Sequence, residues 1–219
     1  MIRLSGICWI TGPVAVGFLL SVGCSGKGDM MLMNVNAKPH TQANEAGQPA
    51  KASPSPRVTV VPFEDGRSDK TKLGSRTSMW GGETPFNVTS GTVGEATAQA
   101  LANYLKSLGW QAQYAKAEPP ATENGPDVVL SGKILDLAVE AKKGFLLTDI
   151  DAKSKLIIQA SNRQDQSSLT RTDAHSGSHD NVFWFEPQDG EQILSEVLEK
   201  NFERFVMNTR FEDRMIRFR

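Results

Sequence analysis

The segment that decides the fold is DIDAKSKLIIQA, residues 149–160, in which apolar or small side chains alternate with charged or amide ones. One face of an extended chain would carry Ile150, Ala152, Ser154, Leu156, Ile158 and Ala160, and the other would carry Asp149, Asp151, Lys153, Lys155 and Gln159. A period of two residues is typical of an antiparallel strand that buries one face. The segment therefore predicts a sheet whose second face meets water or a partner.

The segments on either side also have the character of strands. Residues 128–139, VVLSGKILDLAV, predict a strand that is joined to the first through a turn at residues 142–144. Gly132 within it indicates a bulge or a close approach of another backbone. Residues 167–178 are polar and predict an edge strand whose charges discourage uncontrolled pairing. The sheet is therefore expected to be largely antiparallel.

Two helices flank these strands in the sequence. Thr92 and Glu95 have the spacing of a capping box, and Gly109 stands where a left-handed residue is wanted at the end of a helix. Between them, apolar side chains recur at intervals of three and four residues, which predicts one buried stripe. A second helix, with a similar stripe, is predicted over residues 189–207.

The remaining parts of the domain are shorter or less regular. Residues 58–61 predict a first strand closed by a proline, and residues 110–115 predict another strand after the first helix. Residues 64–89 contain four glycines and a proline and predict a long loop, which in a compact domain is usually functional or mobile. The tail, residues 209–219, alternates arginines with large apolar side chains; it could lie on a membrane or a partner, but docking on its own domain is the more common outcome.

These elements follow the order β-α-β-β-β-α over residues 57–219. Two helices separated by a run of antiparallel strands favour an α+β fold, a two-layer α/β sandwich with a mixed, largely antiparallel sheet and both helices on one face. A segment of this length can bury roughly two thirds of its unfolded surface around one core. We therefore expect a single domain.

The N-terminus carries the features of an export signal. Arg3 supplies positive charge, and residues 7–22, ICWITGPVAVGFLLSV, are apolar or small. The uncharged stretch, residues 4–23, is long enough to cross a bilayer as a permanent anchor. Glycines and a proline within the stretch weaken that alternative, so the sequence favours a cleaved signal.

The end of this stretch, Leu20-Ser21-Val22-Gly23-Cys24, resembles a bacterial lipobox, although Ser21 stands where the usual pattern has Leu. The resemblance implies removal of residues 1–23 and acylation of Cys24, which makes membrane lipid a partner of the chain. Simple cleavage or a retained anchor are the alternatives. Several acyl chains would hold the protein firmly on a membrane. Ser25 after the cysteine, rather than Asp, implies an outer-membrane lipoprotein that faces the periplasm.

Residues 24–56 predict the lipid anchor and a disordered linker. They are rich in Gly, Ala, Asn, Gln, Ser and Pro and show no apolar periodicity. Met30, Met31 and Met33, with His40, could suggest a soft-metal cluster, but their spacing fits no such site and we expect ordinary linker residues. A flexible chain of about 33 residues has a root-mean-square span of roughly 30 Å.

Charge and cysteine content exclude several classes of function. The chain has 24 Lys and Arg against 25 Asp and Glu, so nucleic acid is not expected as a partner. Cys8 and Cys24 are its two cysteines, which excludes a disulfide framework, a cysteine zinc site and a cysteine nucleophile in the rest of the chain. No Walker loop, dinucleotide fingerprint, nucleophile elbow or H-E-x-x-H motif occurs, so we expect neither an enzyme nor a cofactor.

Three residues of the predicted long loop are candidates for binding a partner. Asp65 and Arg67 could form an ion pair that shapes the loop, or Arg67 could bind a carboxylate or phosphate in bidentate fashion. Trp80, beside Met79 and two glycines, could cover the core or serve as an exposed anchor for a partner. The sequence leaves both pairs of alternatives open.

His175 and His179 are weak candidates for a metal site. Together with Asp173 and Asp180 they place four donors within eight residues, and on a strand positions 173, 175 and 179 would share a face. A divalent ion such as zinc could accept that set. A solvated edge strand is the more ordinary interpretation, so no metal site is predicted.

The order of these motifs resembles a known family. Residues 58–63 (VTVVPF), followed by Asp65, Arg67 and Leu73-Gly74, then the capped helix and residues 127–134 (DVVLSGKI), look like YajG-type bacterial envelope lipoproteins. A more distant similarity is to the periplasmic domain of the curli secretion channel lipoprotein and to the TolB N-terminal domain. The resemblance implies an envelope lipoprotein with no catalytic role that works through protein contacts.

We therefore expect a non-catalytic, lipid-anchored envelope protein that acts as an interaction or accessory subunit, with an envelope protein partner or self-association. The alternative is a carrier of lipid or another small ligand, such as an auxiliary lipoprotein of an ABC transport system. A carrier should enclose an apolar pocket, whereas an interaction protein should expose an apolar patch near Trp80 or the tail. A metal-dependent hydrolase using His175 and His179 is a third hypothesis.

Overall fold

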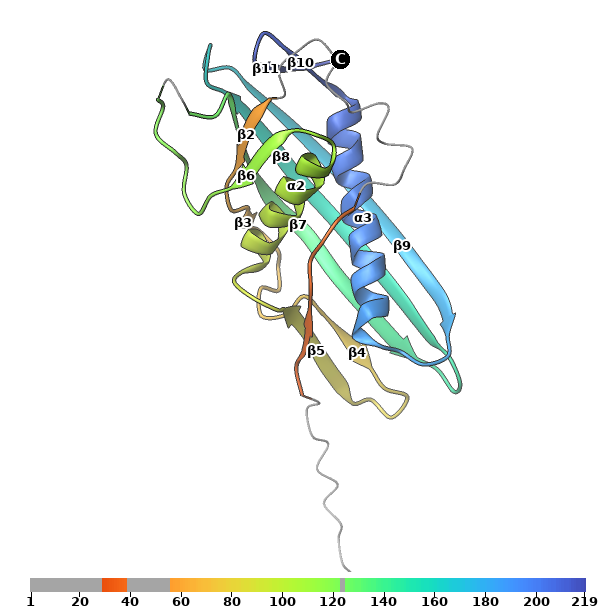
Figure 1. The fold of residues 1–219 in the computed structure, drawn as a ribbon. Helices are drawn as coiled ribbons and strands as arrows, with labels where there is room; N and C mark the ends of the chain where they lie inside the picture. The colour runs from red at the N-terminus through yellow and green to blue at the C-terminus, as the bar shows by residue number, and fades with distance from the viewer. Residues whose placement is uncertain (1–28, 39–55, 123–124) are drawn as a thin grey trace, which may run out of the picture.

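The structure, a computed structural model, describes residues 29–38, 56–122 and 125–219. They form an α+β fold, in which a nine-stranded mixed sheet carries two α-helices on one face and a separate two-stranded hairpin lies at one end (Figure 1). The predicted fold class is confirmed. Neither of these helices combines the length and the apolar character that a membrane-spanning helix needs.

Three long antiparallel strands make up most of the sheet: β7 (Val128–Lys143), β8 (Thr148–Asn162) and β9 (Ser168–Val182). The alternation predicted for β8 is confirmed, because its side chains alternate between buried and exposed along almost its whole length. A side chain at Gly132 would place its Cβ 2.6 Å from the ring of Phe63 and 2.4 Å from the carbonyl oxygen of Ile157. Gly132 is therefore a point of close approach, and the bulge in β7 lies further on, between Ile134 and Asp136.

A parallel part of the sheet lies on the other side of β7. Strand β2 (Arg57–Val60) pairs in parallel with both β7 and β6 (Gln111–Tyr114). β2 and β6 correspond to the strands predicted over residues 58–61 and 110–115. Helix α2 (Val93–Ser107) precedes β6 in the sequence. Its capping box forms as predicted, because the Glu95 amide donates to Thr92 Oγ1 at 3.1 Å and the Thr92 amide donates to Glu95 Oε2 at 2.9 Å. Gly109 takes the left-handed conformation, with φ +87°.

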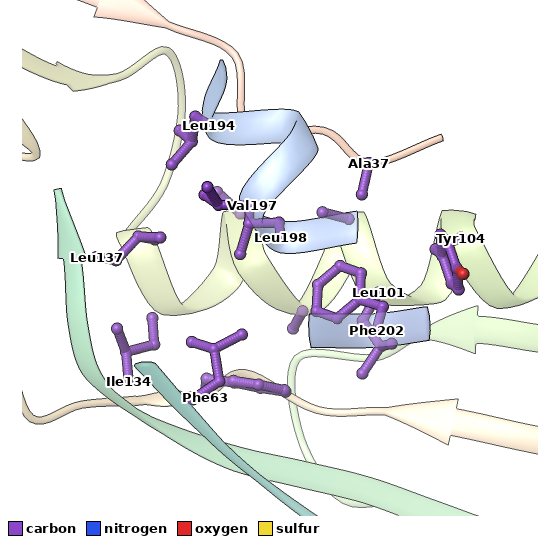
Figure 2. Close-up of a cluster of buried hydrophobic side chains, with 14 of the residues drawn as sticks. Ala37, Phe63, Leu101, Tyr104, Ile134, Leu137, Leu194, Val197, Leu198 and Phe202 are labelled. Atoms are coloured by element: carbon purple, nitrogen blue, oxygen red, sulfur yellow. The ribbon is translucent and has the colours of Figure 1, made fainter. Parts of the chain in front are cut away.

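The core lies between the sheet and the two helices. Helix α3 (Pro187–Met207) packs across β8 and β9, and it meets α2 where the rings of Tyr104 and Phe202 lie 5.7 Å apart. Figure 2 shows Leu101 of α2, Leu198 of α3 and Ile134 of β7 in one cluster of buried side chains. The helix layer therefore covers one face of the sheet and leaves the other open.

The segment predicted as a long loop, residues 64–89, instead contains three short strands. These are β3 (Glu64–Asp65), β4 (Gly74–Thr77) and β5 (Glu83–Val88). β4 pairs with β7 so closely that a Cβ on Gly74 would lie 1.8 Å from the carbonyl oxygen of Val139. The prediction of a loop was therefore wrong. Gly74 and the proline in β5 both weaken the strand pattern in the sequence, so these strands were not recognised.

The linker prediction also fails at one place. Strand β1 (Met31–Met33) pairs in parallel with β5, and the Met33 side chain is fully buried. The edge of β5 accepts this strand, and Met33 fills space beside Gly190 of α3, where its Cε would lie 2.4 Å from an added Cβ. The predicted signal peptide, the acylation site Cys24 and linker residues 39–55 lie outside the described residues.

The C-terminal tail docks on its own domain. It forms a hairpin of β10 (Thr209–Glu212) and β11 (Met215–Phe218), in which Ile216 is fully buried. Arg214 Nε lies 2.7 Å from Asp127 Oδ1, just before the start of β7. Docking of the tail on its own domain, the more common outcome for such a segment, is therefore the one found.

Candidate functional site

The predicted pair Asp65 and Arg67 lies within the fold. Arg67 is 6% exposed, and its Nε and Nη2 donate to the two carboxylate oxygens of Asp65, each at 2.9 Å. Its Nη1 donates to the carbonyl oxygens of Lys72 at 2.9 Å and Leu137 at 3.3 Å. The guanidinium thus joins the loop between β3 and β4 to β7. This is the geometry expected of an ion pair that shapes the loop, and not of an arginine that binds a carboxylate or phosphate of a partner.

This pair also fixes a charge. Hydrogen bonds from Arg67 outweigh partial burial and hold the pKa of the Asp65 carboxyl below its usual range. A carboxylate that is held ionised in this way cannot serve as a general acid near neutral pH. Asp65 and Arg67 therefore brace the loop, with the charged atoms of Arg67 directed inward.

Trp80 lies in the turn between β4 and β5 and is 89% exposed. The turn is closed by hydrogen bonds from the Ser78 amide to the Gly82 carbonyl oxygen at 2.8 Å and from the Gly81 amide to the Ser78 carbonyl oxygen at 3.0 Å. Gly81 has φ +82°, a conformation that disfavours other residues. The indole therefore does not cover the core but lies exposed.

Two further turns expose large apolar side chains that the sequence analysis did not single out. Phe145 and Leu146, in the turn between β7 and β8, are 81% and 63% exposed. Phe183 and Trp184, between β9 and α3, are 74% and 76% exposed. A pair of large apolar residues inside a turn, where neither strand alternation nor a helical stripe calls for them, is the signal that could have identified these positions.

The strand register brings the three turns to one end of the sheet. Thr77 at the end of β4 pairs with Lys142 of β7, and Lys143 pairs with Thr148 of β8. Thr148 in turn pairs with Val182 at the end of β9. Figure 1 shows the ends of β4, β7, β8 and β9 together at the lower side of the view. We call the following residues the apolar end: Met79, Trp80, Phe145, Leu146, Phe183 and Trp184.

The two candidate histidines share the helix-facing side of β9 but do not assemble a metal site. His179 Nε2 lies 3.6 Å from Glu196 Oε2 of α3. Burial, assisted by the charge of Arg204, lowers the pKa of His175. Asp173 binds Arg171 instead, with Nε 2.5 Å from Oδ2. In the part of the chain that the structure describes, no group of three or more His, Cys, Asp or Glu side chains is arranged to hold a metal ion.

The open face of the sheet is polar and shallowly hollowed. A hollow of about 480 Å³ lies across β7, β8 and β9, toward the end of the sheet where β7 turns into β8. Its lining combines small residues with four charged ones, Glu140, Lys142, Asp151 and Lys153. Charges of both signs suit water or a polar partner, whereas an acyl chain needs an apolar lining.

Strand β9 forms one edge of the sheet. It pairs with β8 along its length, and no other strand of the described residues pairs with it. Its side chains on the open face are small or polar: Thr170, Thr172, Ala174, Ser176 and Ser178. A long edge strand presents unpaired backbone groups to which another extended chain can add.

Comparison with known proteins finds structural similarity at low sequence identity. No family model matches the sequence, and no curated protein matches it. Protein XCC0632 from Xanthomonas campestris is 10% identical over 81% of this chain and 92% of that chain, with a TM-score of 0.49.

Two bacterial lipoproteins are also similar. The minor lipoprotein from Acinetobacter baumannii is 11% identical over 68% of this chain and 89% of that chain, with a TM-score of 0.32. Lipoprotein GNA1162 from Neisseria meningitidis is 13% identical over 68% and 98%, with a TM-score of 0.27. Similarity at this level assigns neither a family nor an activity, and the resemblance to YajG-type lipoproteins stays an expectation.

Proposed function

We propose that the protein is a non-catalytic lipoprotein of the bacterial cell envelope, anchored through acylated Cys24 and facing the periplasm, that acts as an interaction or accessory subunit of an envelope assembly. The observation that carries the proposal is the edge of β9, residues 168–182, which among the described residues pairs with β8 alone, beside an open polar sheet face. The lipobox-like sequence before Cys24 supports the anchor, and Ser25 supports the outer membrane.

The edge of β9 suits a partner that adds an extended strand. Backbone amides and carbonyls supply affinity in such a contact, and alternate side chains supply specificity. On the open face, Thr172 and Ser176 are small and polar, so an added strand meets no bulky obstacle there. The partner can be another envelope protein or a second copy of this chain, since either can offer a strand.

The charged groups favour a binding role over a catalytic one. Arg57 Nη2 lies 3.0 Å from Asp127 Oδ1, and Arg214 shares the same oxygen. Burial would raise the pKa of Asp127, but these hydrogen bonds outweigh it and leave the pKa below its usual range. Asp127, like Asp65, is therefore a structural anion, and we propose no reaction for either residue.

The carrier alternative requires an enclosed apolar cavity. The polar hollow on the open face does not supply one, and the space between the sheet and the helices is occupied by core side chains such as Leu101 and Phe202 (Figure 2). These observations favour the interaction subunit over the carrier.

Photo-crosslinking in intact cells tests the proposal. A photoreactive amino acid at Thr172, on the β9 edge, should capture one discrete protein or a second copy of the chain. The matched control is the same amino acid at Gln99, which is exposed on the helix layer. Capture of phospholipid alone at Thr172, or an equal pattern at both positions, would overturn the interaction role.

The anchor is tested separately. Palmitate labelling of the full chain should be lost in Cys24→Ser, whereas Ser25→Ala should retain it. Labelling that persists in Cys24→Ser would remove acylation of this cysteine from the proposal.

A further inference from the structure

We infer that the apolar end docks into the lipid surface to which Cys24 is attached, so that the domain stands on the membrane through three turns as well as through its acyl chains. The inference rests on the lipid anchor of the proposed function. It adds a second, separate contact whose residues lie far from Cys24 in the sequence.

The first step is that three separate turns present the same chemistry at one end. Trp80, Phe145 and Trp184 belong to different turns, and each is more than three quarters exposed. The pairing of β4 with β7, of β7 with β8 and of β8 with β9 holds these turns in one row (Figure 1). Exposed apolar side chains that gather in this way mark a binding surface.

The second step is the place where the chain arrives from Cys24. Strand β1 runs parallel to β5 with Met31 opposite Phe86, so the residues before Met31 run toward the beginning of β5 and the Trp80 turn. Met30 lies beside Glu83 and Pro85 in a common surface hollow. Cys24 precedes Asp29 by five residues, which span at most about 17 Å when fully extended. An acylated Cys24 therefore brings the bilayer to the same end of the molecule as the apolar side chains.

The third step is the type of side chain. Trp is enriched at the boundary between lipid headgroups and acyl chains, because its ring is apolar and its N–H remains hydrogen-bonded there. Phe145 and Leu146 project beyond the strands and can reach the acyl region. Lys142 and Lys143 are exposed just behind them, where a basic side chain meets anionic headgroups.

The opposite end of the sheet has a different character. There Arg217 of the C-terminal hairpin pairs with Asp165 of the turn between β8 and β9 at 2.6 Å, and Arg163 of the same turn pairs with Glu118 of the loop after β6 at 2.8 Å. An end covered by paired charges stays in water at little cost. The two ends thus differ in the way that a lipid surface would require, and it is the apolar one at which the first described residues, 29–30, lie.

Cysteine labelling of the full, processed lipoprotein tests the inference. Leu146→Cys lies at the apolar end of β8, and Gln164→Cys lies in the turn that follows its other end; both positions are exposed. The protein is purified in detergent and reconstituted into vesicles of phosphatidylethanolamine and phosphatidylglycerol. The reaction with a membrane-impermeant maleimide is then followed, with the unsubstituted lipoprotein as the background control.

In vesicles, Leu146→Cys should react severalfold more slowly than Gln164→Cys at every protein-to-lipid ratio, and solubilisation in mild detergent at low protein concentration should reduce that difference. Equal rates in vesicles would overturn the inference. Protection in native membranes without protection in the vesicles would also overturn it, and would assign the apolar end to a protein partner. Protection that disappears on dilution with lipid would assign it to contact between copies.

The outcome is separable from that of the proposed function. Palmitate labelling of each cysteine variant shows whether the anchor is present before accessibility is measured. An acylated protein whose Leu146→Cys reacts freely contradicts docking and leaves the anchor intact. A chain that is not acylated contradicts the proposed anchor itself.

Discussion

Asn162 and Ile216 are joined by two hydrogen bonds that run in opposite directions. The Ile216 amide donates to Asn162 Oδ1 at 2.8 Å, and Asn162 Nδ2 donates to the Ile216 carbonyl oxygen at 3.0 Å. Asn162 ends β8, and Ile216 lies in the last strand, so one buried amide side chain holds the C-terminal hairpin on the sheet.

Replacing this amide should loosen the hairpin. Asn162→Ala leaves the buried amide and carbonyl of Ile216 without these partners, which costs about 1–3 kcal/mol of unfolding free energy. Urea unfolding of the purified protein measures the loss, and limited proteolysis should release residues 209–219 first. Gln164→Ala, at an exposed neighbouring position, is the control and should change stability little. An Asn162→Ala variant as stable as the control would contradict this role.

The pair formed by Asp65 and Arg67 should contribute to stability as a unit. Arg67→Ala removes a buried guanidinium and leaves the largely shielded Asp65 carboxylate without its partner. Breaking a buried ion pair in this way typically costs about 3–5 kcal/mol of unfolding free energy. We expect the lower end of that range because Asp65 remains 23% exposed. In a double-mutant cycle with Asp65→Asn, the combined loss should be smaller than the sum of the single losses. Additive losses would show that the two side chains act independently.

Stability should depend on pH in the acid range. The pKa values of Asp65 and Asp127 are lowered in the folded protein, so each carboxyl contributes stability that is complete above its ordinary pKa of 3.8. This contribution is lost as the pH falls through the lower folded values. The urea concentration at the midpoint of unfolding should therefore decrease as the pH is lowered below about 4. In Asp65→Asn this decrease should be less steep than in the unsubstituted protein. The same pH dependence in both proteins would contradict the assignment.

Two helix glycines should respond differently to the same substitution. Alanine normally stabilises a helix by about 1 kcal/mol relative to glycine. A Cβ at Gly94, however, would lie 2.0 Å from the carbonyl oxygen of Phe63, whose backbone cannot easily move. Gly94→Ala should therefore destabilise the protein by about 1–3 kcal/mol.

Gly190 of α3 provides the matched comparison. Its added Cβ would meet the terminal methyl of Met33, which can rotate away. Gly190→Ala should therefore change the unfolding free energy much less than Gly94→Ala, as measured by urea unfolding of both variants. If Gly94→Ala were the more stable of the two, the close contact between α2 and Phe63 would be wrong.

The sequence predicted those parts of the fold whose information is local. The alternation of residues 149–160 and the capping box at Thr92 each depend on a few neighbouring side chains. Strands β1 and β4 depend instead on distant partners, because β1 needs the edge of β5 and β4 needs the backbone of Val139. Such short strands carry too few residues to show a period.

The candidate site was predicted only in part. Trp80 was identified from its glycine-rich surroundings, and the structure exposes it. Phe145 and Trp184 were missed because each lies in a turn whose place beside the others depends on the register of four strands. Arg67 was identified as a residue of interest, but its inward direction is set by the carbonyl oxygens of Lys72 and Leu137, one of them 70 residues away.

Strand β1 also sets how much of the chain separates the domain from the proposed acylation site at Cys24. Because Met31 pairs with β5, six residues of the sequence, 25–30, separate Cys24 from β1, and residues 34–56 join β1 to β2. Extra residues added between β1 and β2 would therefore leave the tether to the proposed acylation site unchanged, whereas the same number added before Met31 would lengthen it.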